Sequence, residues 1–424
     1  MAKKLFAFLG VGNKDGKYEE IEYYFTGKPE KGYITEYIQE ALAELLNEPN
    51  LQIIVFVTEK AKDVNWEPKD KIGLKIKLEK LNVNYKAVDI PDGKTNREIW
   101  QIFTKVYDEI ELHDEIYVDV THSFRSIPII FMSVLNYAKV TKRCDIKRIF
   151  YGAFDAKENG RAPIYDLTLF NQITEWSSGV EQLLSTGECE MFCSTVEKTL
   201  RHLSEETDEV IRLISECSRL IKEFYTDLKL VRGKSVLDDG EKLYQVLCEI
   251  KALNTEKHIA MQPFFHILGR VENQVDFFKN ENLIKKILEC VKLCRKFGQY
   301  QQAYTFLREN IINYVCINSG LDWKKEKPDR MIAEKVMNSL NYMINIKKCC
   351  DKEINEKEND ENVKHILENR IDFISNDAVK LFGALINYRN DLAHAQFRME
   401  YLSKKKIKKK IDSFIDDFEK YYIS

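Results

Sequence analysis

The hydrophobic positions of the first 170 residues form short runs that alternate with helical patterns. The runs are rich in β-branched and aromatic residues and are apolar on both faces, which is typical of strands buried in a parallel sheet. They occupy residues 4–10, 51–58, 84–91, 114–121 and 147–154. Because strands of this kind alternate with helices, we predict an open, doubly wound, Rossmann-like α/β sheet for residues 1–170.

The clearest helical pattern in this region covers residues 95–112. Thr95 and Glu98 have the spacing of a capping box, in which each side chain satisfies a backbone N–H group that the first helical turn leaves free. The apolar positions that follow at helical spacing are Ile99, Phe103, Val106 and Ile110. They predict one apolar face that packs on the sheet.

After about residue 170 the strand pattern fades and helical spacing dominates. Apolar residues recur every three or four positions in residues 174–188, 206–231 and 280–298. We therefore expect an all-α linker region at 171–295 and a second all-α domain at 296–424.

Composition adds few constraints. Hydrophobic residues make up 44% of the 424 residues and charged residues 31%, which is ordinary for a soluble globular protein. The net charge of −3 gives no overall basic field, so a nucleic-acid role requires a local patch. The apolar run at the N-terminus ends at Gly10 and Gly12, which favours a strand over a signal peptide. No apolar run is long enough to span a membrane.

The ten cysteines are scattered along the chain. Two pairs, Cys189/Cys193 and Cys290/Cys294, are one helical turn apart, but no cluster of histidines accompanies them. Buried reduced thiols are therefore favoured over a metal site, and we predict no bound metal. This cysteine usage suits a reducing cytosol, so a cytoplasmic location is expected.

The loops that follow the predicted strands are candidates for ligand binding, because doubly wound sheets bind ligands beyond the carboxyl ends of their strands. These loops are residues 10–16, 58–61, 91–95, 121–126 and 152–155. They are rich in glycine and in hydroxyl residues such as Thr58, whose N–H and O–H groups are the donors that phosphate oxygens need. Arg125 adds a planar cation that can bind a phosphate or stack on a base.

Two features of these loops also allow other interpretations. The glycines of residues 10–16 are spaced one residue too far apart for a dinucleotide fingerprint, and the next strand ends at Thr58 instead of an acidic residue, which favours a tight turn. His122 could be a general base, a base-reading residue or a packing residue. Ligand contact is favoured over catalysis because the segment has no serine or cysteine nucleophile elbow and no second acid nearby. The alternative is that Ser123 or Ser126 simply caps a helix opened by Pro128.

The segment DVTHSFRS at 119–126, with VDIPDGKTNREIWQIF before it and IFYGAFD after it, resembles the CARF domain of type III CRISPR-associated ribonucleases. The resemblance covers most of residues 3–170. It implies that two such domains pair and bind a cyclic oligoadenylate across their two-fold axis, with cyclic tetra-adenylate the common ring and hexa-adenylate the alternative. Ser123 stands where many relatives have glycine. The residues that the resemblance places beside the ring are Gly10, Gly12, Asn13, Thr121, His122, Ser123, Phe124 and Arg125.

A second candidate site lies in YRNDLAHA, residues 388–395. The apolar residues at helical spacing around it are Leu381, Leu385, Tyr388 and Leu392. The motif therefore lies on a helix or enters one, and Asn390 and His394, four residues apart, share a face. Arg389 is about 140° around a continuous helix from His394. Either its long side chain swings back, or the helix begins at Asn390.

These residue types suit RNA cleavage by the substrate's own 2′-hydroxyl. Histidine can act as acid or base at cellular pH, arginine can stabilise the extra charge on phosphorus, and Asn390 can orient either group. One histidine cannot easily serve both sides of a phosphorus, whereas two copies facing across a dimer axis could. For the bare motif alone, a surface Arg–Asp pair with a partly exposed histidine is the simpler interpretation.

RNDLAHA resembles the Arg-x4–6-His motif of HEPN ribonucleases, and GQYQQAYTFLREN at 298–310 resembles the first helices of HEPN domains. The resemblance implies an obligate homodimer and metal-independent cleavage of single-stranded RNA to a 2′,3′-cyclic phosphate, with Arg389, Asn390 and His394 as the catalytic residues. The order of the two regions predicts a cyclic-oligoadenylate-activated endoribonuclease of CRISPR antiviral defence that needs no cofactor. The alternative is a non-enzymatic CARF-type sensor or regulator with an inactive HEPN domain.

The lysine-rich segment SKKKIKKKID at 403–412 follows this motif closely. It is either the solvated face of a helix or a contact for the RNA backbone, and the sequence leaves both interpretations open.

Overall fold

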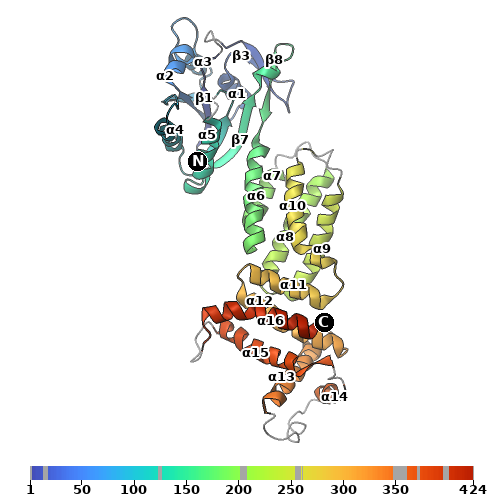
Figure 1. The fold of residues 1–424 in the computed structure, drawn as a ribbon. Coiled ribbons are helices and arrows are strands. Elements are labelled where there is room, and N and C mark those ends of the chain that lie inside the picture. The colour runs from blue at the N-terminus through green and yellow to red at the C-terminus, as the bar shows by residue number, and fades with distance from the viewer. Residues whose placement is uncertain are drawn as a thin grey trace. The chain divides into compact units, whose positions relative to one another are not determined.

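A computed structural model describes residues 2–12, 18–122, 127–200, 208–253, 259, 261–346, 361–369, 373–394 and 401–423. The chain divides into two compact units, residues 1–171 and 172–424 (Figure 1). The division lies next to the predicted end of the α/β region. The first unit contains the strands, and the second is helical.

The first unit is built on an eight-stranded sheet with the order β3-β2-β8-β7-β6-β1-β4-β5. Its strands are β1 (Lys3–Leu9), β2 (Ile21–Phe25), β3 (Gly32–Thr35), β4 (Leu51–Val57), β5 (Asn84–Asp89), β6 (Glu115–Asp119), β7 (Asp145–Gly152) and β8 (Arg161–Asp166). Neighbouring strands are parallel except in the pairs β2–β3 and β7–β8, which are antiparallel. The predicted α/β sheet is confirmed, and the five predicted strands correspond to β1, β4, β5, β6 and β7.

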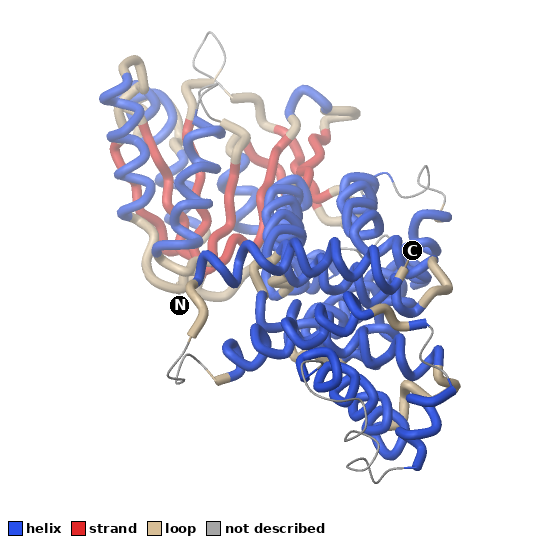
Figure 2. Tube along the Cα trace, turned by 60° about the horizontal axis from the view of Figure 1, so that its bottom comes forward, coloured by secondary structure: helices blue, strands red, loops and turns tan. Residues whose placement is uncertain are grey.

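Helices cover both faces of this sheet (Figure 2). Helices α1 (Ile38–Leu46) and α3 (Leu74–Lys80) pack on one face, and α4 (Asn96–Asp108) and α5 (Ile127–Thr141) pack on the other. Because successive strand residues point to opposite faces, β1 contributes Leu5 and Leu9 to the first core and Phe6 and Phe8 to the second. The strands are apolar on both faces for this reason.

The start of α4 differs from the predicted capping box in one contact. Thr95 Oγ1 accepts a hydrogen bond from the Glu98 amide at 3.2 Å, as predicted. Glu98 Oε2, however, accepts from the amide of Lys94 at 2.9 Å, one residue before the expected donor. The buried face of α4 is formed by Ile102, Val106 and the following Ile110, while Ile99 and Phe103 are only half-buried. The predicted apolar face was therefore partly wrong, because the helix is rotated so that Ile102 faces the sheet.

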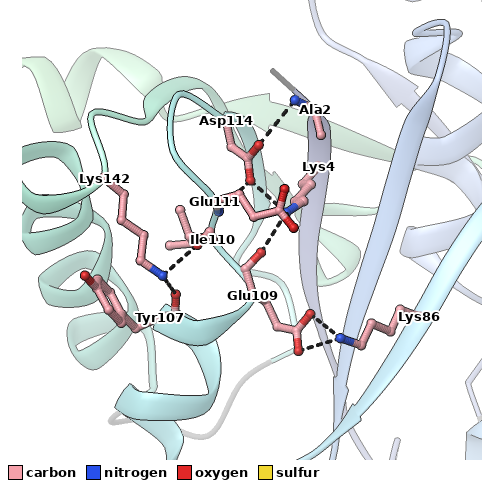
Figure 3. Close-up of polar contacts among 9 residues, drawn as sticks. All are labelled: Ala2, Lys4, Lys86, Tyr107, Glu109, Ile110, Glu111, Asp114 and Lys142. Atoms are coloured by element: carbon pink, nitrogen blue, oxygen red, sulfur yellow. Dashed lines mark hydrogen bonds and ion pairs between the residues drawn. The ribbon is translucent and has the colours of Figure 1, made fainter.

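A polar network fastens the amino ends of the central strands (Figure 3). Lys4 Nζ lies 2.7 Å from a carboxylate oxygen of Asp114, and both side chains are almost fully buried. Lys4 also donates to the Glu109 carbonyl at 2.9 Å, and Asp114 accepts from the amides of Ala2 and Glu111. Burial opposes ionisation of Asp114, but these bonds outweigh it and keep the pKa of Asp114 below its usual value. A buried ion pair thus holds the amino ends of the central strands, at the end of the sheet opposite to the loops that follow the carboxyl ends of the strands.

The second unit is all-helical. The first helix begins at Thr168, just before the boundary between the units. The helices among the described residues, with two short helical turns that carry no α label, are α6 (Thr168–Thr186), α7 (Glu190–Leu200), α8 (Asp208–Lys229), α9 (Gly233–Ala252), α10 (Gln262–Val275), Asp276–Lys279, α11 (Leu283–Lys296), α12 (Tyr300–Asn318), Glu326–Arg330, α13 (Met331–Ile346), α14 (Glu361–Asn369), α15 (Asn376–Ala393) and α16 (Lys404–Tyr422). One cluster of buried residues runs from Trp176 to Tyr422. Within it, Asn310 of α12 donates to the Ile284 carbonyl of α11 at 2.9 Å. One continuous core therefore spans both the predicted linker and the predicted second domain.

The cysteines contribute to the cores as free thiols. Of the eight cysteines in the described part of the chain, seven are buried and Cys248 is half-buried. Cys193 Sγ lies 3.6 Å from the Ser218 carbonyl oxygen. None of the described helices is both long enough and apolar enough to cross a bilayer.

Candidate ligand pocket and candidate cleavage motif

A cavity of about 550 Å³ opens at the carboxyl ends of the central strands. Its volume is in the range of pockets that hold small ligands. Loops after β1, β4, β6 and β7 line it, as the parallel topology requires, because those strand ends meet at one edge of the sheet. The predicted site residues that it brings together are Gly10, Gly12, Thr58, Thr121 and His122.

The loop after β1 has glycines at two places where a side chain does not fit. A Cβ atom at Gly10 would lie 2.9 Å from the hydroxyl oxygen of Tyr18. Gly12 has a φ of 80°, in the left-handed region that favours glycine. Asn65, fully buried, donates from Nδ2 to the Gly10 carbonyl at 2.9 Å. These constraints hold the backbone of the loop close to the cavity.

His122 lies beside this loop. Its ring centroid is 4.5 Å from that of Tyr18, and its Nε2 atom is buried with no hydrogen-bond partner among the described residues. Burial lowers the pKa of His122 to about 4, so the imidazole is neutral at pH 7. A buried polar atom without a partner is costly, and a ligand in the cavity can supply the missing hydrogen bond. This geometry supports ligand contact by His122.

Thr121 joins two of the loops through Asp119 and Gly152. The amide of Thr121 donates to Asp119 Oδ1 at 2.9 Å, and Thr121 Oγ1 accepts from the Gly152 amide at 2.8 Å. Asp119 is fully buried and also accepts from Gln39 Nε2 at 3.3 Å. Burial raises the pKa of Asp119 to about 6, although the bonds from Thr121 and Gln39 oppose the rise. Asp119 thus organises the loop without lining the cavity.

Thr58 has a structural role in addition to its place in the cavity wall. It caps α2 (Glu59–Ala61) by accepting from the Ala61 amide at 3.3 Å. The other predicted ligand contacts, at Asn13, Ser123, Phe124 and Arg125, lie outside the described residues.

The cavity wall also includes residues that were not predicted: Tyr18, Glu19, Tyr23, Glu36, Tyr151 and Asp155. The described wall therefore carries three carboxylates and no lysine or arginine. Carboxylates accept hydrogen bonds from the amino group of adenine and from ribose hydroxyls. Glu19 is partly neutralised by Lys157, whose Nζ lies 2.5 Å from Glu19 Oε2. No local sequence pattern connects Glu36 with this pocket. Glu36 directly follows β3, and the pairing of β3 with β2 and of β2 with β8 brings it to the cavity wall.

The second candidate site lies at the end of α15 in the helical unit. Ser375 caps the helix, which continues through Ala393, and the amide of His394 still donates to the Asn390 carbonyl at 3.0 Å. The alternative that the helix begins at Asn390 is therefore wrong. His394 is exposed, while Arg389 and Asn390 are half-buried, and Arg389 Nη1 donates to Asn390 Oδ1 at 3.0 Å.

The motif is held by aromatic packing and by one buried carboxylate. Tyr388 stacks on Tyr304 of α12 with ring centroids 5.6 Å apart, and it meets Phe414 of α16 edge-on at 5.2 Å. Asp391 is buried, and its Oδ1 accepts from the amide of Leu402 at 3.3 Å. The Asp391 carboxylate therefore positions the segment that leads into α16. It is not paired with Arg389, although the simpler interpretation of the motif assumed an Arg–Asp pair.

Comparison with known proteins identifies the α/β unit. Residues 4–155 match the family model described as CRISPR system endoribonuclease Csx1, CARF domain. The chain is also similar to CRISPR-associated protein MJ1674 of Methanocaldococcus jannaschii, with 25% identity over 277 residues. That alignment covers 56% of this chain and 44% of the archaeal protein, so the chain spans less than half the length of this relative.

These findings define a class. Residues 4–155 of the first unit are similar to the CARF domain of that family, and the chain is similar to a CRISPR-associated protein. This similarity points to a ligand-sensing role for the first unit.

Proposed function

We propose that this protein is a cyclic-oligoadenylate-activated, metal-independent endoribonuclease that cuts single-stranded RNA in type III CRISPR defence, and that it works as a homodimer. The observation that carries the proposal is the occurrence, in one chain, of a Csx1-type CARF domain and of an Arg-Asn-x3-His motif at an exposed helix end. The activator proposed is cyclic tetra-adenylate, with hexa-adenylate as the alternative ring.

In the proposed reaction, the RNA 2′-hydroxyl attacks the neighbouring phosphorus and the 5′-oxygen of the next nucleotide leaves. His394 of one copy removes the proton from the 2′-hydroxyl, and His394 of the second copy protonates the leaving oxygen. Arg389 stabilises the charge that develops on the phosphorane, and Asn390, bonded to Arg389, orients it. The products are a 2′,3′-cyclic phosphate and a 5′-hydroxyl.

The proposed activator enters the cavity at the carboxyl ends of the CARF strands. A ring of four nucleotides is larger than the ligand that a cavity of about 550 Å³ encloses, which supports sharing of the ring between two copies. His122 Nε2 and the backbone of Gly10 and Gly12 supply neutral hydrogen-bonding groups. The activator can favour a cutting arrangement only through a difference in its affinity for the two states.

The test is an RNA cleavage assay with EDTA present, run with and without cyclic tetra-adenylate and cyclic hexa-adenylate. A labelled unstructured RNA should be cut only with an activating ring, and His394→Ala should reduce the rate by about 10²- to 10⁴-fold. The same variant should bind the ring as the wild type does, measured by calorimetry. Ring binding without RNA cleavage for every ring would favour the non-enzymatic sensor and contradict the enzyme.

A further inference from the structure

The first turns of α16 carry an unusual concentration of charge. Residues 404–411 contain six lysines and no acidic residue, and all four acidic residues of the helix lie after Ile411. Two of those acids have basic partners on other helices: Asp412 pairs with Arg295 at 2.6 Å and Glu419 with Lys292 at 2.7 Å. Two of the four acids in the carboxyl-terminal half of the helix thus have basic partners, whereas the amino-terminal half has six lysines and no acid among them.

This arrangement is unfavourable for the helix alone. The amino end of a helix carries a partial positive charge, so lysines there are repelled by it. Lysines four residues apart, as in Lys404/Lys408 and Lys405/Lys409, also repel each other. The cap supplied by Ser403, which accepts from the Lys406 amide at 3.3 Å, does not neutralise this charge. The stability of α16 therefore gives no reason for the lysines, whereas an anion bound outside the helix would.

Burial separates the two faces of this segment. Ile411 is buried and Ile407 is half-buried against the helical core. The lysines that point away from it and are exposed are Lys404, Lys405, Lys406, Lys408 and Lys409. Within the described part of the chain, none of these five forms an ion pair with a carboxylate. Lys408 Nζ lies over the ring of Tyr300, 5.8 Å from its centroid, and the ammonium groups of the other four lysines are available to a ligand.

The exposed aromatic residue Tyr401 lies at the start of this surface. Its side chain is 59% exposed. The amide of its neighbour Leu402 is bonded to Asp391, three residues before His394, so Tyr401 lies next to the last turn of α15. Tyr304, which stacks on Tyr388 of α15, donates from its hydroxyl to the Ile407 carbonyl at 2.8 Å. The lysines are therefore fixed relative to the candidate cleavage motif.

From this arrangement we infer that Tyr401 and the exposed lysines of α16 form the surface that holds the single-stranded RNA substrate beside His394. An exposed aromatic ring followed by a row of cations matches single-stranded RNA, whose bases stack on aromatic side chains while its phosphates contact lysines. The inference rests on the proposed ribonuclease function and names the residues that grip its substrate. The lysines contact the phosphates of the RNA backbone. The affinity they give is therefore independent of the RNA sequence and falls as the salt concentration rises.

Binding is tested separately from cutting in the full-length His394→Ala protein with EDTA. A fluorescein-labelled oligouridylate is titrated by anisotropy at several KCl concentrations, with and without cyclic tetra-adenylate. Adding Lys405→Gln, Lys406→Gln and Lys409→Gln together should lower affinity by about 10- to 100-fold near 0.1 M salt and reduce the slope of log affinity against log salt by about 2. The melting temperature of this triple variant should not fall, because the substitutions relieve the repulsion between lysines within α16.

The matched control is the triple variant Lys324→Gln, Lys325→Gln and Lys327→Gln, which removes the same charge from exposed lysines elsewhere in the helical unit. It should leave both affinity and salt slope near those of the parent. Tyr401→Ala should lower affinity about 5- to 100-fold with the salt slope unchanged, and Tyr401→Phe should restore it, because stacking needs only the ring.

Equal losses in the two lysine variants, or an unchanged salt slope in the α16 variant, would overturn the inference. The outcome is distinct from that of the cleavage assay. If RNA binding depends on these lysines but the protein cuts no RNA with any ring, the RNA-binding surface stands and the proposed ribonuclease activity is rejected. If the α16 lysine variant with His394 intact cuts RNA at the wild-type rate, the ribonuclease activity stands and the RNA-binding surface is rejected.

Discussion

The ligand pocket of the α/β unit draws its residues from loops far apart in the chain, whereas the candidate cleavage motif lies within residues 389–394 at the end of one helix. The histidines of the two sites differ accordingly. His122 is buried against Tyr18, and its low pKa keeps it neutral. His394 is exposed at the end of α15. One environment suits hydrogen bonding to a ligand, and the other leaves an imidazole open to a substrate.

The two kinds of site place different requirements on the fold. Parallel strands bring the loops of one chain to one edge, so a single copy already forms a cavity that is open to solvent on one side. A helix end presents only neighbouring residues, and continuous helix geometry separates Arg389 from His394 by about 140°. In the proposed mechanism the second copy supplies the histidine that one helix cannot. The helical site is therefore expected to depend on assembly and the pocket on internal packing.

The largest expected effect is a loss of RNA cleavage with unchanged ring binding, which would show that the cleavage motif and the ligand pocket act separately. Arg389→Ala should reduce ring-activated RNA cleavage by about 10²- to 10³-fold, because it removes the donor proposed to stabilise the phosphorane. Arg389→Lys should recover only part of the rate, since lysine lacks the planar fork. Calorimetry should give the same ring affinity for both variants as for the wild type. A loss of ring affinity equal to the loss of rate would contradict the separation.

The next effect concerns the pH dependence of the pocket. The folded-state pKa of Asp119, about 6, lies above its ordinary value of 3.8, so its protonation adds stability that is full below pH 3.8 and lost as the pH rises through about 6. The difference corresponds to about 3 kcal/mol. The pKa of His122, lowered to about 4, acts in the opposite direction, and its contribution is lost as the pH falls through about 4.

The two trends oppose each other in the wild type between about pH 4 and 6.5. Asp119→Asn leaves only the histidine trend, so this variant should lose stability on acidification while the wild type changes little. Urea unfolding of the α/β unit, followed by fluorine NMR of a fluorotryptophan at buried Trp66, measures the difference. Parallel pH profiles for the two proteins would show that Asp119 is not held in the protonated form by its burial.

The smallest expected effect concerns the junction of two pocket loops. Thr121→Val keeps the shape of the side chain but leaves the Gly152 amide without the acceptor it has at 2.8 Å. The loss should cost about 1–3 kcal/mol and lower ring affinity about 10-fold, measured by calorimetry. Thr141→Val, at an exposed threonine of α5, is the control and should bind the ring normally. RNA cleavage at saturating ring should be close to wild type in both variants.

Much of the fold could be predicted because it follows from local patterns. Apolar runs with flanking loops were sufficient for the five parallel strands β1, β4, β5, β6 and β7. Thr95 could be identified as a cap from its spacing to Glu98, and α15 from its apolar residues Leu381, Leu385 and Tyr388. In each case the signal lies within a few residues, where backbone propensity and side-chain periodicity act directly.

Part of the pocket could be predicted for a similar reason. Parallel strand ends converge in any doubly wound sheet, so Gly10, Thr58, Thr121 and His122 could be grouped before their distances were known. Their chemical states could not be. The neutral form of His122 depends on its burial beside Tyr18. The raised pKa of Asp119 depends on burial that outweighs the bonds from Thr121 and Gln39.

The amino-acid sequence was therefore sufficient to predict the fold class, the strand ends that line the cavity and the helix at whose end Arg389 and His394 lie. Only the tertiary structure decided that β2, β3 and β8 extend the sheet and bring Glu36 and Tyr18 to the pocket, and that one core joins the helices from α6 to α16. The physical reason is that edge-strand pairing and core sharing depend on contacts between distant residues, and no local pattern encodes which distant partner gains most from being buried.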